Sequence, residues 1–328
     1  MSHHQPQRSP VALGGILAAL AAVCGFLSQL LPFFFSLLAP LPLALAALWL
    51  PRSMALACGV VAALLLGLFS GPLAGVSFLL RTVLLGWVIG FLVKGRRHYA
   101  VLFTAATLAQ VSGTLLYLLL TLAISGTGAT FLAQFSGDLT DNMLAAAEDM
   151  NPYETLATNG MSAAEAEQLF RHAVQLTVQL SPAIYVLMFA VVSGAVLLLL
   201  HLLCQRLRLD AQVTSPSWQS ILMPPAVLVP FLAAWILLLV ERHFDNQVLW
   251  IVAANVMVIG AAAMAMDGFS YCLAKLKFTE KPFMVQLLYL MLALLMGWYL
   301  IVVFAVIGVF DSIADYRHLR SQKGEHTQ

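Results

Sequence analysis

The chain has 328 residues, of which 61% are hydrophobic and 9% are charged, and its formal net charge is +1. An ordinary soluble domain carries about 25% charged residues, so this composition excludes a typical soluble protein. The apolar residues form blocks of about 17–28 residues bounded by Pro, Gly or charge, which predicts an all-α polytopic membrane protein with about nine transmembrane helices. Basic stretches interleaved with aromatic residues are absent, so nucleic acid is not an expected partner, whereas the lipid bilayer is.

The apolar blocks predict the organisation of the chain. We expect a cytoplasmic N-terminal tail (1–10), spans 1–5 (11–125), an acidic extracytoplasmic loop (126–181), span 6 (182–203), spans 7–9 (204–310) and a polar C-terminal tail (311–328). Lys and Arg concentrate on the cytoplasmic side, so the basic turn Lys94–Arg97 orients the protein in the cell (inner or plasma) membrane. Nine crossings place the basic C-terminal tail outside, which conflicts with this rule. The sequence therefore predicts neither the side of the C-terminus nor whether spans 2 and 7 cross the membrane fully.

The first expected span carries a ladder of small residues, Gly14, Ala18 and Ala22, spaced four apart. Such residues form a groove along a helix that lets another backbone approach closely. The ladder predicts either a docking face for a partner subunit or a packing face within the protein.

An aromatic turn follows, made of Phe33, Phe34 and Phe35. Aromatic side chains are typical of the membrane interface, so they predict anchoring there or, alternatively, the cap of an outer substrate pocket. Span 2 is then short and interrupted by Pro40 and Pro42, a pattern that sometimes flanks transporter binding sites.

Span 4 contains one charge, Arg81, near its midpoint. An arginine at that depth costs about 2.5–3.5 kcal/mol on insertion scales, so we expect a partner, a polar cavity or a ligand to compensate it. Its guanidinium is a candidate to bind an anionic substrate or a phospholipid phosphate. Alternatively, it pairs with a carboxylate such as Asp267 and holds spans 4 and 8 together.

The loop over 126–181 carries seven acids and one base. Within it, Ser162 and Glu165 have the spacing of a capping box, and apolar residues follow at helical spacing. We therefore expect an amphipathic helix on the outer surface, either a plain interfacial helix or a lid over an outer pocket.

Two further intramembrane polar residues are candidate substrate ligands, Asn255 within span 8 and Asp267 at its end. The alternative role for Asn255 is an interhelical hydrogen bond. Asp267 lies near the inner membrane boundary, and the alternative for this residue is exposure to solvent. His201 and Cys204 share a helical face, but zinc needs three or four ligands, so no metal site is predicted. The GxxxxGK[ST], HExxH and GxSxG patterns are absent, and we expect neither an enzyme nor a cofactor.

A set of features extends along nearly the whole chain: Leu41-Pro42, Lys94–Arg97, the acidic loop before Ser181-Pro182, Trp250 and Asn255 before Gly268-Phe269-Ser270, and the ending Gly308–Arg317 with Asp311 and Asp315. Together they resemble the YybS-like bacterial membrane proteins, a family of unknown function. The ending is the most specific part of this resemblance.

The first six spans, over 11–203, also resemble the membrane-embedded S component of energy-coupling-factor transporters. The resemblance implies a six-helix S-component-like bundle with a three-helix C-terminal extension. It implies capture of a small molecule from outside, with a separate transmembrane coupling protein and ATPases as partners. In that group an AxxxA face on the first helix docks the coupling protein, and Ala18 and Ala22 match it here.

These observations leave three functional hypotheses. The first is a substrate-capture subunit with Arg81 in its pocket, for an unknown small molecule and energised by separate proteins. The alternative is a non-transporting membrane scaffold or assembly factor that uses the same faces for protein contacts. The third is a lipid-handling protein in which Arg81 meets a phosphate.

Overall fold

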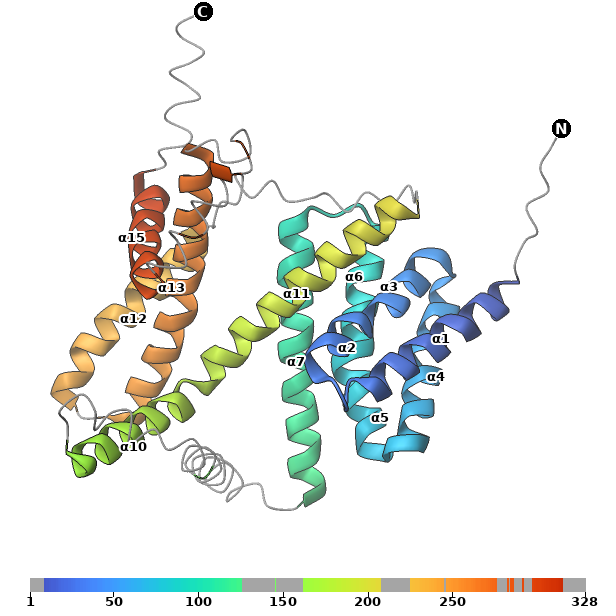
Figure 1. Cartoon of the computed structure of the whole chain (residues 1–328), viewed down its shortest axis with the longest axis horizontal. Coiled ribbons are helices and arrows are strands. Elements are labelled where there is room, and N and C mark those ends of the chain that lie inside the picture. The colour runs from blue at the N-terminus through green and yellow to red at the C-terminus, as the bar shows by residue number, and fades with distance from the viewer. Residues whose placement is uncertain are drawn as a thin grey trace, which may run out of the picture. The chain divides into compact units, whose positions relative to one another are not determined.

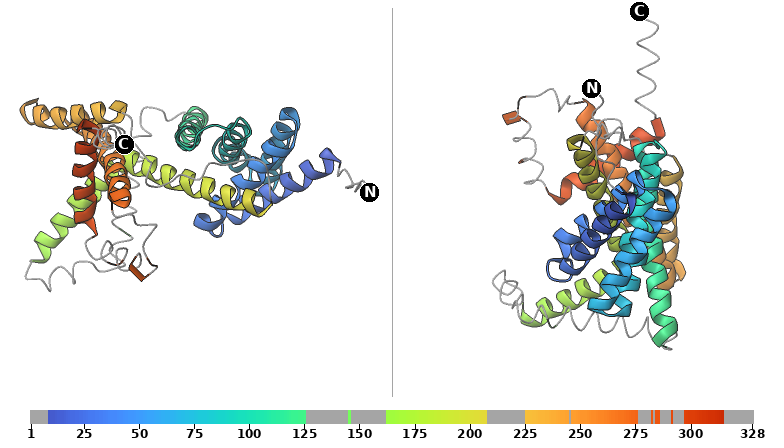
Figure 2. Two further views of the ribbon diagram at one scale, coloured as in Figure 1. Left: turned by 90° about the horizontal axis from the view of Figure 1, so that it is seen from above. Right: turned by 90° about the vertical axis from the view of Figure 1, so that its right-hand side faces the viewer.

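The computed structural model describes residues 9–125, 145, 162–207, 225–244, 246–275, 282, 284–285, 291 and 297–314. In these ranges the regular structure is α-helical apart from one π-helical turn, and it contains no strand (Figures 1 and 2). The all-α fold class is therefore confirmed for the part of the chain that is described.

The chain forms two compact units, and each is described by itself. The first consists of Met1–Gly137 and Met188–Ser215, and the second of Asp138–Leu187 and Pro216–Gln328. The border between Leu187 and Met188 falls inside helix α11 (Ser181–Arg206), so the two parts of this helix belong to different units.

Prolines mark the starts of several helices in the first unit. Pro10, Pro32, Pro40 and Pro72 each lie in a first helical turn, where a missing N–H costs little. Gly71 ends the fourth helix with φ +96°, a conformation that glycine adopts readily. The helices are α1 (Pro10–Leu27), α2 (Pro32–Leu38), α3 (Pro40–Trp49), α4 (Arg52–Ser70), α5 (Pro72–Phe78), the π-helical η1 (Leu79–Val83), α6 (Leu84–Lys94) and α7 (Tyr99–Ser125).

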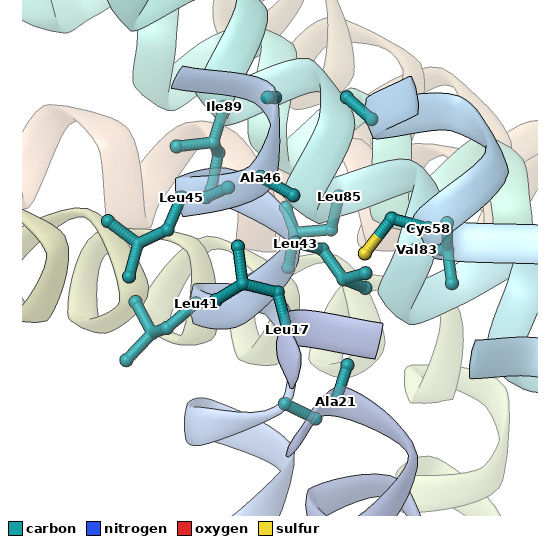
Figure 3. Packing of buried hydrophobic residues seen from close by; sticks show 14 of the residues in the cluster. Leu17, Ala21, Leu41, Leu43, Leu45, Ala46, Cys58, Val83, Leu85 and Ile89 are labelled. Atoms are coloured by element: carbon teal, nitrogen blue, oxygen red, sulfur yellow. The ribbon is translucent and has the colours of Figure 1, made fainter. Parts of the chain in front are cut away.

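Helix α3 is the centre of the first unit, although it is short. Every residue from Pro40 to Ala47 is buried, with α1 and α6 packed against the helix. A Cβ at Gly90 of α6 would lie 2.6 Å from the carbonyl oxygen of Ala44, so the two backbones come close only because position 90 is glycine. Figure 3 shows the buried side chains of α3 among those of α1, α4 and α6. Because protein surrounds α3, the length of this helix does not have to match the thickness of the bilayer.

The second unit contains α10 (Ala163–Gln179), the first turns of α11, α12 (Pro225–Phe244), α13 (Gln247–Lys275) and α15 (Trp298–Ala314). Helices α13 and α15 run antiparallel, because Gly268 lies against Phe304 while Gly308 lies against Met264 (Figure 1). The ring centroids of Phe269 and Phe304 lie 5.5 Å apart in an edge-to-face arrangement beside this crossing.

Six helices are long and apolar enough to cross a membrane: Pro10–Leu27, Arg52–Ser70, Pro72–Lys94, Tyr99–Ile124, Ser181–Arg206 and Gln247–Leu273. Three shorter apolar helices lie where spans 2, 7 and 9 were expected, at Phe34–Trp49, Val227–Glu241 and Tyr299–Ile313. The described residues thus contain several apolar helices, and the count of nine transmembrane helices is not confirmed.

Candidate functional site

Arg81 lies in the π-helical turn η1, between α5 and α6. The three segments form one 23-residue apolar span, Pro72–Lys94, and Arg81 is its one charge before the terminal Lys94. The Arg81 side chain is exposed. A π-helical turn inside an α-helix is rare and frequently occurs at functional sites.

Helix α7 supports this turn through a close contact of backbones. A Cβ at Gly113 would overlap the carbonyl oxygen of Leu80 and would lie 3.5 Å from Cα of Arg81. The hydroxyl oxygen of the next residue, Thr114, is buried, and it has no hydrogen-bond partner in the described ranges. The backbone of Arg81 is therefore held in place by α7 while its side chain remains exposed.

The charge distribution around Arg81 is one-sided. Residues 1–137 contain six Lys and Arg residues but no Asp or Glu, and all 15 acids of the chain lie at or after Asp138. The one acid assigned to the first unit, Asp210, lies outside the described residues. Consequently no carboxylate side chain of the described first unit is available to pair with Arg81. A carboxylate partner for Arg81 would therefore have to come from beyond these residues.

The aromatic turn lies at the start of α2. Phe34 is 58% exposed and meets Phe35 edge-to-face at 5.3 Å, whereas Phe35 packs partly against the core of the first unit. The side chain of Phe33 lies outside the described residues. The expected role of these rings above a substrate pocket therefore stays a prediction.

The small-residue ladder of α1 faces the interior of the first unit. Ala18 is 2% exposed, Ala22 packs against the core, and a Cβ at Gly14 would meet Leu50 at 3.4 Å. These contacts correspond to packing within the protein, and docking of a partner by these residues stays a prediction. One position along the chain, Gly15 has open space around it, and Ala19 is exposed.

Asn255 joins three helices in the second unit. Its Oδ1 accepts from the backbone N–H of Ala183 at 2.8 Å, and its Nδ2 donates to the carbonyl oxygens of Gln179 and Ile251, each at 2.8 Å. Gln179 ends α10 and Ala183 lies in the first turn of α11, so the amide satisfies backbone groups at two helix termini. Both donors of the Asn255 amide are thus used by the fold.

Asp267 lies at the crossing of α13 and α15, where it is completely buried. Its Oδ2 accepts a hydrogen bond from Oγ of Ser312 at 3.3 Å. The alternative that Asp267 is solvated is therefore wrong, because α15 covers it. Asn255 and Asp267 are separated by about 18 Å along α13, since a helix rises about 1.5 Å per residue, so they do not share one site.

Asp311 belongs to the expected polar C-terminal tail, yet it is only 2% exposed and lies in the same helix pair. The last expected span ends at residue 310, whereas α15 continues through Ala314. The available signal was its spacing of three from Gly308, which places both residues on one face of a helix. Buried acids within membrane helices are uncommon and often functional.

The described ranges contain no group of three His, Cys, Asp or Glu side chains that could hold a metal ion. A family model described as "Predicted membrane protein (DUF2232)" matches residues 16–312. Neither the curated proteins nor the solved structures contain a significant match to the chain.

Proposed function

The chain belongs to the DUF2232 family of predicted membrane proteins, and we propose that it is a multi-pass subunit that captures a small anionic molecule at Arg81. The proposal places the protein in the cell membrane with a cytoplasmic N-terminus. It assigns no enzymatic activity to the chain, and assigns the energy for uptake to separate proteins, a coupling protein and ATPases. This division of labour follows from the S-component resemblance expected for the first six spans, which is itself a prediction.

The observation that carries the proposal is an exposed arginine at the middle of an apolar span, within a unit whose described residues have no acid. A guanidinium at that depth needs compensation, and a carboxylate or phosphate can supply it by accepting two parallel hydrogen bonds. The π-helical turn and the contact with Gly113 fix the position of the arginine, as binding of a defined ligand requires.

The test is mass spectrometry of small molecules released from the purified full-length protein and from Arg81→Gln. The proposal expects an anionic molecule in the parent protein, lost in Arg81→Gln, retained at least in part in Arg81→Lys, and unchanged in the control Arg171→Gln. Arg171 lies on α10 of the second unit and forms an ion pair with Glu167 at 3.0 Å, so its removal changes the charge of the chain without altering the first unit. The same bound molecules in Arg81→Gln would overturn the proposal, and the thermal stability of each variant separates ligand loss from misfolding.

The second candidate is a non-transporting scaffold, and the outward face of α1 favours it. Gly15 and Ala19 are small, four apart and open to the outside of the unit, which is the pattern of a helix-docking face. Ala19→Leu would then release co-purifying membrane proteins while leaving the fold and any small molecule unaffected. If Ala19→Leu retains every co-purifying protein, this candidate fails.

A further inference from the structure

We propose that one end of the first unit binds the headgroups of anionic phospholipids in preference to zwitterionic ones. The surface consists of four exposed arginines, called here the basic rim: Arg52, Arg96, Arg97 and Arg206. They come from the start of α4, the turn after α6 and the end of α11. This surface is distinct from Arg81, which lies at mid-span, so the inference does not depend on the function proposed above.

A lysine joins the first two of these segments. Nζ of Lys94 donates to the carbonyl oxygens of Leu50 at 3.2 Å and Ala47 at 3.4 Å. Leu50 precedes Arg52 by two residues, and Lys94 precedes Arg96 by two residues. The start of α4 and the turn after α6 therefore lie at the same end of the unit.

Helix α11 crosses α7 obliquely, and it ends on the side of the unit where α7 begins (Figure 1). Nε2 of Gln110 donates to Oγ of Ser193 at 2.9 Å, and earlier in α7 Phe103 lies 3.6 Å from a Cβ placed at Gly194. These contacts lie seven positions apart in α7 but one position apart in α11, as expected where two helices cross obliquely. Arg206, in the last turn of α11, consequently lies toward the level of Tyr99, where α7 begins.

The basic rim lacks acidic neighbours from its own unit. The described residues of the first unit include no Asp or Glu, and none of the four arginines forms an ion pair in the described ranges. Clusters of Lys and Arg at the ends of transmembrane helices are attracted to anionic lipid surfaces. Negative charge at the rim would relieve the mutual repulsion of the four guanidinium groups.

Backbone conformation gives a second, independent reason to assign a role to one of these side chains. Arg96 has φ +50° and ends α6 in a Schellman-type turn, with Arg97 N–H bonded to the carbonyl of Leu92 at 3.3 Å and Arg96 N–H to that of Val93 at 2.9 Å. Glycine is favoured in this left-handed position, and arginine is strained there. An arginine at a position that favours glycine points to a role for its side chain.

The length of the neighbouring span places the basic rim at the level of lipid headgroups. Pro72–Lys94 has 23 residues, so it is about 35 Å long and crosses a hydrocarbon layer of roughly 30 Å. The turn after Lys94 therefore emerges at the level of the phosphates. Beside the rim, Leu56, Val101 and Leu202 are exposed apolar residues, as contact with acyl chains requires.

The experiment uses the full-length protein in detergent, with native mass spectrometry to count bound lipids. Phosphatidylglycerol and phosphatidylcholine with the same acyl chains are added separately, to the parent protein, to Arg96→Gln/Arg97→Gln and to the control Arg171→Gln. We expect tighter binding of phosphatidylglycerol by the parent and by the control. The affinity should fall about fivefold for each rim arginine removed, since each basic residue near an anionic surface contributes about that factor.

Arg96→Gly separates binding from folding. Glycine relieves the backbone strain, so the thermal stability should rise while the preference for phosphatidylglycerol falls. A purely structural role of Arg96 would move both quantities in the same direction.

Equal binding of the two lipids by the parent, or an unchanged preference in the double variant, would overturn the proposal. Equal occupancy by glycerol phosphate, which lacks acyl chains, would overturn it in favour of a soluble anion. Displacement of the lipid by a co-purifying acidic protein at the rim would overturn it in favour of a protein partner.

Discussion

Oδ1 of Asn255 accepts a hydrogen bond from the backbone N–H of Ala183 at 2.8 Å, across 72 positions of sequence. With the two bonds donated by its Nδ2, this side chain ties α13 to the junction of α10 and α11. A polar residue within an apolar helix thus has a defined structural role in the second unit.

We predict that Asn255→Leu lowers the free energy of unfolding by about 1–3 kcal/mol, because it leaves buried backbone groups without their partner. The measurement is equilibrium unfolding of the full chain in mixed micelles. Gln247→Leu, at an exposed position in the first turn of the same helix, is the matched control and should change stability little. Equal effects of the two substitutions would contradict the assigned role.

The crossing of α13 and α15 should not tolerate a methyl group. A Cβ at Gly308 would overlap the carbonyl oxygen of Met264, so we expect Gly308→Ala to cost about 1–3 kcal/mol by overpacking. Gly268→Ala should cost a similar amount, and the double variant less than the sum, because the first substitution already separates the helices.

Gly15→Ala is the control for this pair. Its Cβ would enter open space on α1, so the substitution should be neutral or should stabilise by up to about 1 kcal/mol through helix propensity. Unfolding measured in the same micelles compares the three positions. A neutral Gly308→Ala would show that the crossing is wider than described.

Lys94 should contribute to stability without any lipid. Its Nζ binds two carbonyl oxygens at the end of α3, so we expect Lys94→Met to destabilise the protein by about 0.3–1 kcal/mol. Arg97→Met, which removes an exposed charge without such bonds, should have no effect in detergent that lacks anionic lipid. Thermal unfolding under those conditions makes the comparison, and equal shifts for both variants would refute the distinction.

The capping box of α10 should make its helix sensitive to acid. The Ser162 hydroxyl, at 2.8 Å, and then the Ser162 backbone N–H, at 3.0 Å, donate to the Glu165 carboxylate and hold its pKa below the usual 4.5. A carboxyl with a lowered folded pKa stabilises the fold above its unfolded pKa, and this stabilisation is lost as the pH falls through the folded value.

Carbon-13 NMR of labelled glutamate in the full-length protein measures this titration directly. We expect the Glu165 midpoint below 4.5 in the parent and a rise toward the ordinary value in Ser162→Ala. Ala164→Ser, at an exposed position in the same turn, is the control and should leave the midpoint unchanged. A Glu165 midpoint that is the same with and without the Ser162 hydroxyl would contradict the assignment.

Local features were predictable from the sequence where their causes are local. The capping box of Ser162 and Glu165 is confirmed, because its donors and acceptors lie within four residues of each other. The apolar blocks predicted helices of membrane character, and six described helices are long enough to cross. The candidate at Arg81 also came from one span, since a charge in an apolar segment is visible in the sequence alone.

Features that depend on distant residues were not predictable in this way. The sequence determined that this is a helical membrane protein with a charge at mid-span, because hydropathy and helix signals act over a few turns. Only the tertiary structure showed that α3 is enclosed, that Asp267 and Asp311 are buried, and that Gly113 faces a π-helical turn. Burial and close approach depend on which face of one helix meets which face of another, and for these residues the meeting partner lies tens of positions away in the chain.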